Sequence, residues 1–91
     1  MTPLEKVLKE LNEYFGKEVI LETEPMVFSG GEEYELLTFY YGESKTDMNG
    51  LLYMKKRIIV QGTKDDITFN ESLPPKLVKS IATFFEESVL K

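Results

Sequence analysis

The spacing of the apolar residues changes twice along the chain, and this change limits the folds that the chain can adopt. Two stripes near the ends of the chain have the spacing of three or four residues that one face of an α-helix requires. The first contains Leu4, Val7, Leu8, Leu11, Tyr14 and Phe15, and the second contains Leu77, Val78, Ile81, Phe84 and Phe85. Between the stripes, apolar and polar residues alternate, which indicates β-strands.

Residues with strong positional preferences bound both predicted helices. Thr2 is suited to cap the first helix, Pro3 fits its first position, and Gly16 is a natural stop. Ser72 is expected to cap the second helix, because Pro74-Pro75 fits the first turn of a helix and no later turn.

Four strands are expected between the helices, near residues 19–28, 34–41, 51–61 and 66–70. Short turns join them, which predicts an antiparallel meander. Each helix has one apolar stripe, so both helices must cover the same face of the sheet. The 91 residues are therefore expected to form a single domain, residues 1–91. Its fold class is α+β, a two-layer sandwich in which N- and C-terminal helices flank a four-stranded meander.

The Gly30-Gly31 pair predicts a two-residue hairpin turn, because glycine adopts the positive φ angles that such a turn needs. This turn sets Leu21 opposite Tyr40 and places glutamates among large apolar residues on the outer face of the 18–41 hairpin. The candidate partner-binding residues there are Glu22, Glu24, Met26, Phe28, Glu33, Glu35, Leu37, Phe39 and Tyr41. Clustered apolar groups that are rimmed by charge mark interaction surfaces. Aromatic residues on a wet sheet face also stabilise cross-strand pairs, which is the alternative interpretation.

The charge of the chain is unevenly distributed. Sixteen acidic and eleven basic residues give a formal net charge of −5. Residues 1–50 contain eleven acids and four bases, for −7, whereas residues 51–91 contain five acids and seven bases, for +2. Residues 18–35 contain six glutamates and no basic residue. This segment would repel phosphate and attract a basic partner.

The chain contains no histidine and no cysteine, which removes several kinds of catalytic and metal site. Nucleophilic triads, imidazole acid–base catalysis, zinc fingers and thiol redox chemistry all need one of these residues. The sequence 45–50 resembles part of a calcium loop, but Lys45 and Lys56 would occupy two ligand positions. We therefore expect no enzymatic activity, no cofactor and no metal.

A cytoplasmic location without membrane contact is expected. The first residues lack the basic and apolar regions of a secretion signal, and no apolar run is long enough to cross a bilayer. Small secreted domains also often depend on disulfides, which this chain cannot form.

Three adjacent cations interrupt the third predicted strand. Tyr53, Lys55 and Arg57 would share one side, and an aromatic residue beside two cations is typical of a surface that binds single-stranded nucleic acid. In the competing interpretation, the cations neutralise glutamates on neighbouring strands, which suits an acidic chain better. Lys56 would point the other way, and if it lies over the core it needs a carboxylate or a path to water.

Three functional hypotheses follow. The first is a non-catalytic protein-binding or assembly module that acts through the outer face of the 18–41 hairpin and forms a homodimer. The second is an acidic inhibitor that imitates nucleic acid on a nucleic-acid-binding protein. The third is a binder of single-stranded nucleic acid that uses Tyr53, Lys55 and Arg57.

Overall fold

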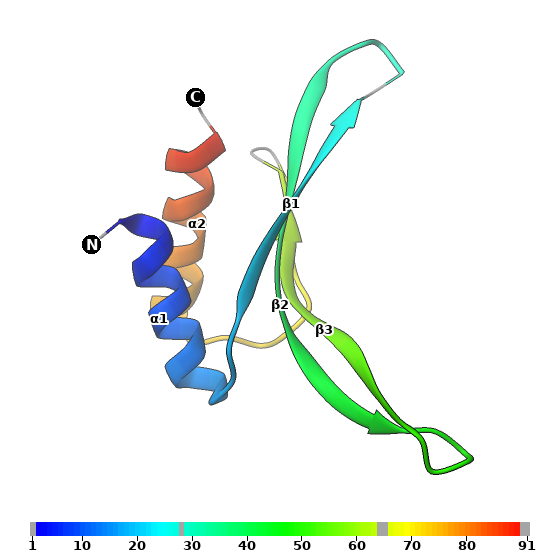
Figure 1. Ribbon diagram of the computed structural model, residues 1–91. Helices are drawn as coiled ribbons and strands as arrows, with labels where there is room; N and C mark the ends of the chain where they lie inside the picture. Colours follow the sequence, from blue (N-terminus) through cyan, green and yellow to red (C-terminus); the bar gives the residue numbers. More distant parts are fainter. Residues whose placement is uncertain (1, 28, 64–65, 90–91) are drawn as a thin grey trace.

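The computed structural model describes residues 2–27, 29–63 and 66–89. Its elements are α1 (Pro3–Phe15), β1 (Ile20–Val27), β2 (Glu33–Thr46), β3 (Leu52–Gly62), β4 (Ile67–Phe69) and α2 (Pro75–Val89). All neighbouring strands are antiparallel, and their order in the sheet is β1-β2-β3-β4. The predicted α+β fold, with a four-stranded meander between two helices, is confirmed (Figure 1).

The ends of α1 follow the prediction from sequence. The side-chain oxygen of Thr2 accepts a hydrogen bond from the backbone N–H of Glu5 at 3.2 Å, and Pro3 occupies the first turn. Gly16 ends the helix in the left-handed region, with φ of 64°. The Asn12 side chain then accepts a hydrogen bond from the Val19 N–H at 2.7 Å, which ties the last turn of α1 to the start of the sheet.

The start of α2 differs from the prediction. The helix begins at Pro75, and the N–H of Val78 donates to the carbonyl oxygen of Pro74, so Pro74 occupies the cap position. Ser72 lies two residues too early to cap the helix. Proline suits the entrance to a helix because its fixed φ and missing N–H cost nothing there.

Both helices lie on one side of the sheet, and the hydrophobic core fills the space between the two layers (Figure 1). Phe39 is at its centre, with ring centroids 5.6 Å from Phe84 and 6.4 Å from Phe85. The buried residues are Val7, Leu11, Val19, Leu37, Phe39, Ile59, Val60, Leu77, Ile81, Phe84 and Phe85. The two apolar stripes predicted from sequence thus supply the helical half of this core.

The predicted register of the first hairpin is wrong by one residue. Leu21 pairs with Phe39 instead of Tyr40, and the connection between β1 and β2 spans residues 28–32 instead of two glycines. Gly31 has a φ of 87°, but Gly30 has no positive φ. A two-residue type I′ turn needs positive φ at both positions, so this loop is of another kind. Because side chains alternate, the one-residue shift moves every side chain of β2 to the opposite face.

A β-bulge interrupts the pairing of β2 with β3. Phe39 pairs with Val60 and Tyr40 pairs with Ile58, which leaves Ile59 as an extra residue. Ile59 and Val60 are both fully buried. The bulge thus lets two consecutive residues of one strand contribute to the core, and bulges also increase local bending and twist.

Beyond the bulge, β2 and β3 continue as a two-stranded ribbon that projects away from the helices (Figure 1). We call residues 42–57 the arm. Strand β1 pairs with β2 only up to Tyr40, and β4 pairs with β3 only from Val60 to Gly62. Both edges of the arm therefore lack a neighbouring strand among the described residues.

A matched pair of substitutions tests the register. Leu37 is buried and its neighbour Leu36 is only half-buried, on the opposite face. We expect Leu37→Ala to lower the free energy of unfolding by about 2–5 kcal/mol and Leu36→Ala to lower it by about 1 kcal/mol or less. Urea unfolding at low protein concentration measures both. A larger loss for Leu36→Ala would contradict the observed register and favour the one predicted from the Gly-Gly turn.

Candidate protein-interaction surface

The register divides the predicted partner-binding residues between the two faces of the sheet. Glu22, Glu24 and Met26 lie on the face away from the helices. The β2 members lie on the helix side: Glu33, Glu35, Leu37, Phe39 and Tyr41. Phe28 lies outside the described residues. The prediction that all nine share one outer face is therefore wrong, because it depended on the two-residue turn.

The apolar members of the helix-side group are committed to the core. Leu37 is 3% exposed and Phe39 is fully buried. The ring of Tyr41 packs against that of Phe15 from α1, with centroids 5.4 Å apart. Glu33 and Glu35 lie near the β1–β2 connection and are exposed.

Among the described residues, no helix lies over the opposite face of the sheet, and we call this face the uncovered face (Figure 1). Two side-chain hydrogen bonds across strands mark this side, from Gln61 to Thr38 at 3.0 Å and from Ser44 to Met54 at 3.4 Å. Besides these four, its residues are Ile20, Glu22, Glu24, Met26, Tyr34, Leu36, Tyr40, Gly42, Thr46, Leu52, Lys56 and Ile58. A sheet face turned to water is expected to be mostly polar. This face is instead rich in apolar side chains, as predicted. The residues that β2 contributes to it, however, differ from the predicted ones.

Lys56 lies on the uncovered face and not over the core. Its Nζ is 2.8 Å from Oε2 of Glu22 and 4.7 Å from the centre of the Tyr40 ring. Lys56 pairs in register with Gly42, so no side chain of β2 separates it from β1. The hydrogen bond with Lys56 lowers the pKa of Glu22, and the same bond raises the pKa of Lys56.

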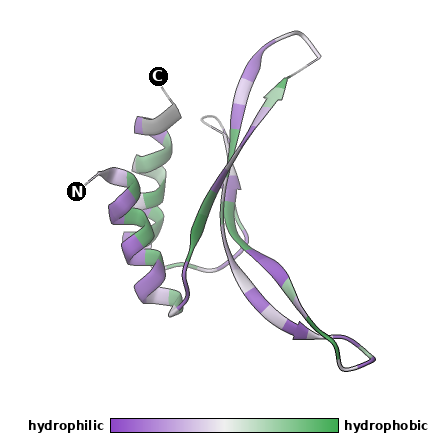
Figure 2. Cartoon of the chain, in the orientation of Figure 1, coloured by the Kyte–Doolittle hydropathy of each residue, from purple (hydrophilic) through white to green (hydrophobic). Residues whose placement is uncertain are grey.

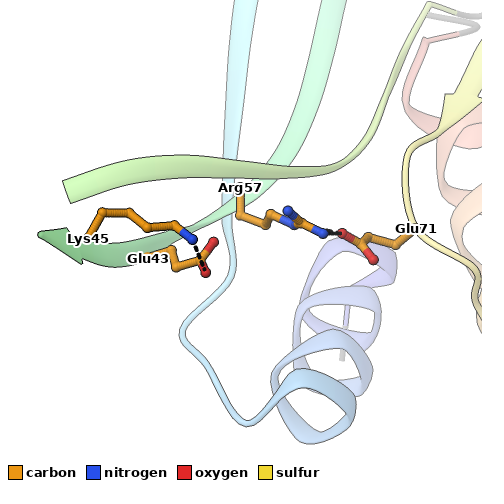
Figure 3. A network of polar contacts seen from close by, with 4 residues as sticks. All are labelled: Glu43, Lys45, Arg57 and Glu71. Carbon is orange, nitrogen blue, oxygen red and sulfur yellow. Dashed lines mark hydrogen bonds and ion pairs between the residues drawn. The ribbon is translucent and has the colours of Figure 1, made fainter. Parts of the chain in front are cut away.

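Tyr53, Lys55 and Arg57 do share one side of β3, as predicted, and it is the helix side. Arg57 is already engaged, because its Nε and Nη2 both donate to Oε1 of Glu71, at 2.7 and 2.6 Å (Figure 3). Lys55 is opposite Glu43 in register. The cations of this strand thus neutralise acids of the same chain.

A second ion pair lies beside that of Arg57 on the same side of the sheet. Lys45 Nζ is 3.1 Å from Oε1 of Glu43 (Figure 3). The hydrogen bond with Lys45 is the main cause that lowers the pKa of Glu43, with smaller effects from Arg57 and Lys55. The bond to Glu71 raises the pKa of Arg57.

Five exposed, large apolar side chains lie within residues 48–54, at the end of the arm. They are Met48, Leu51, Leu52, Tyr53 and Met54. Figure 2 shows hydrophobic colouring near the end of the arm. Leu52 is 78% exposed and Met54 is 67% exposed. This cluster is not evident from the sequence. Alternation predicts a strand here, but it does not show whether the helices extend far enough to cover these residues. The turn at Asn49-Gly50, directly before four large apolar residues, was the available indication.

The backbone at the end of the arm is fixed by its own chain. Oδ1 of Asp47 accepts hydrogen bonds from the N–H groups of Asn49 and Leu51, at 2.8 and 2.9 Å. The N–H of Gly50 donates to the carbonyl oxygen of Asp47, and Gly50 has a φ of 80°. A type I turn followed by a left-handed glycine is a common way to close a hairpin. The exposed apolar residues are thus presented on an ordered turn.

The described residues contain no group of three or more acidic side chains that could hold a metal ion. A cleft of about 430 Å³ lies between α1 and α2, and its lining includes Lys6, Lys76, Lys79 and Glu87. Paired carboxylates of the kind used in acid–base catalysis are not among its lining residues. Within the described part of the chain, no helix is both long and apolar enough to cross a bilayer.

The contact between Lys56 and Glu22 can be tested by titration. We expect the Glu22 carboxyl to titrate below its ordinary value of 4.5, and Lys56→Met to bring its pKa back toward that value. Because the folded-state pKa of Glu22 is lowered, the pair stabilises the fold above the unfolded-state pKa and loses this effect as pH falls through the folded-state pKa. Carboxyl-carbon NMR measures the pKa directly. Lys55→Met is the matched control, and an equal response to both substitutions would contradict the contact.

Comparison with known proteins adds no relative: no protein-family model, no curated protein and no solved structure matched the chain.

Proposed function

We propose that the chain is a protein-binding module whose docking surface combines the uncovered face with the end of the arm. The observation that carries this proposal is the set of apolar side chains on the uncovered face, of which Ile20, Leu52 and Met54 are exposed, and which continues into the exposed Met48 and Leu51 at the end of the arm. Full burial of a side chain such as Leu52 or Met54 is worth about 1.5–3 kcal/mol. A partner that covers several of them gains enough for specific association.

The shape of the arm supports the same proposal. A two-stranded ribbon is only marginally stable by itself in water. The arm is such a ribbon, and its exposed cluster lies at its far end, where it adds nothing to the core. An arm of this kind gains its stabilisation from a surface on another molecule.

The two alternatives have less support from the contacts. For nucleic acid, Arg57 is occupied by Glu71, and Lys55 lies opposite Glu43, an acid that would repel phosphate. For a nucleic-acid mimic, Glu22 and Glu24 lie on one face whereas Glu33 and Glu35 lie on the other. A phosphate-like array would need them on one surface.

We further propose that the module is non-catalytic and acts in the cytoplasm. The chain has neither histidine nor cysteine, so catalysis would rest on carboxylates, lysines or hydroxyls alone. The lack of cysteine also suits a reducing compartment.

Photo-crosslinking in the native cells tests the proposed function. A benzophenone amino acid replaces Leu52 on the arm in one variant and Lys9, exposed on α1, in a control variant. We expect protein adducts from position 52 that are absent or much weaker from position 9, with adduct partners identified by mass spectrometry. Circular dichroism checks that both variants keep the fold.

Two results would overturn the proposal. One is the same adduct yield from both positions, which would mean that the arm meets proteins only by chance. The other is lipid as the sole adduct from position 52, which would assign the arm to a membrane surface.

A further inference from the structure

The residues of the uncovered face form rows across the sheet, each containing one residue of β2. In order along β2, the rows are Met26–Tyr34, Glu24–Leu36, Glu22–Thr38–Gln61, Ile20–Tyr40–Ile58, Gly42–Lys56, Ser44–Met54 and Thr46–Leu52. The Tyr40 row lies in the middle, with three rows on either side.

Rows at the same distance from the Tyr40 row, on its two sides, are similar in chemical character. The middle row is apolar, and Ile20 in it is 44% exposed. The rows next to it are charged, by Glu22 on one side and by Lys56 on the other. The two outer rows at each end contain large apolar side chains: Leu36, Met26 and Tyr34 at one end, where Glu24 lies beside Leu36, and Met54 and Leu52 at the other.

Such a pattern is what a twofold-symmetric interface requires, because one surface must then be complementary to itself. We propose that the partner of the uncovered face is a second copy of this chain, stacked face to face about a twofold axis that crosses the strands at the Tyr40 row. The arm of each copy then lies over the β1–β2 end of the other. This inference rests on the proposed function, since it names the partner of the same surface.

The charges select this arrangement over the alternative. With the axis across the strands, the Lys56–Glu22 ion pairs of the two copies lie over each other in opposite directions, so Lys56 of each copy lies near Glu22 of the other. An axis along the strands would instead place Lys56 near Lys56 and Glu22 near Glu22, and like charges in contact destabilise an interface. On the uncovered face, the charged residues are Glu22 and Glu24 at one end and Lys56 at the other, so acid and base again meet.

The apolar rows meet in the same arrangement. The Met54 row lies over the Leu36 row of the partner, and the Leu52 row lies over the row of Met26 and Tyr34. Face-to-face sheets keep their strands within about 30° of each other, which leaves these rows within side-chain reach.

The dimensions of the face indicate how tight the dimer is. Twelve residue steps from Tyr34 to Thr46, two to three strands wide, give roughly 800–1,200 Å² of buried surface in total. This is the low end for specific complexes, so we expect a dissociation constant in the micromolar range.

Sedimentation over a range of concentrations tests the dimer. We expect the wild-type chain of 10.5 kDa to move from monomer to a particle of twice that mass. Leu36→Glu and Met54→Lys each place a charge against apolar side chains of the other copy, and each should raise the dissociation constant by about 100-fold or more. Unfolding in urea at low concentration checks that both monomers remain folded.

Mixing the two variants tests the register. Their heterodimer joins Lys at 54 of one copy to Glu at 36 of the other, and leaves the second Leu36–Met54 contact as in the wild type. We expect the mixture to form a dimer with at least about tenfold tighter association than either variant alone. The matched control is Met54→Lys mixed with Leu36→Lys, which repel each other and should not associate.

Two outcomes would overturn the inference: a wild-type chain that stays monomeric throughout, or a dimer that the mixed variants fail to restore. Neither outcome contradicts the proposed function, which is still supported if position 52 crosslinks to a different protein. Wild-type dimer formation with self-adducts from position 52 supports both.

Discussion

The packing of Phe39 against α2 is the contact on which the rest of the structure depends. Its ring meets Phe84 and Phe85 in the centre of the core, so β2 must turn its odd-numbered residues toward the helices at this point. A sheet residue that points inward sends its neighbours outward. The position of one phenylalanine therefore decides that Thr38 and Tyr40 face away from the helices, and with them the composition of the uncovered face.

The helices could be predicted from sequence because their determinants are local. The Thr2 cap, the left-handed Gly16 and the apolar stripes all act within a few residues. The order of the elements was likewise predictable, since period-two segments joined by short connections have few ways to pair. The cap at Pro74, which displaces Ser72, is an error of two residues in an otherwise correct helix.

The candidate surface could be predicted only in part, because strand register depends on contacts between distant residues. Two glycines made a two-residue turn the simplest choice, but burial of Leu37 and Phe39 outweighs local turn preference. The bulge at Ile59 also interrupts the alternation of β3. Val60 therefore faces the helices, although Ile58 and Lys56 lie on the uncovered face. Glu22, Glu24 and Met26 were placed correctly, since an uncovered sheet face follows from having both helices on one side. The partners of Lys56 and Arg57 come from β1 and the segment before α2, and no sequence spacing relates them.

The hydrogen bonds of Asp47 at the end of the arm have a consequence for the entropy of association. A loop that becomes ordered only on binding loses backbone freedom at that moment, and the loss weakens the complex. Here Asp47 and Gly50 already hold the backbone of the turn. What remains free is the conformation of fully exposed side chains such as Met48, and methionine adapts to irregular surfaces better than branched residues do. The end of the arm is therefore a fixed backbone that carries adjustable side chains, a combination suited to contacts that tolerate variation in the shape of the opposing surface.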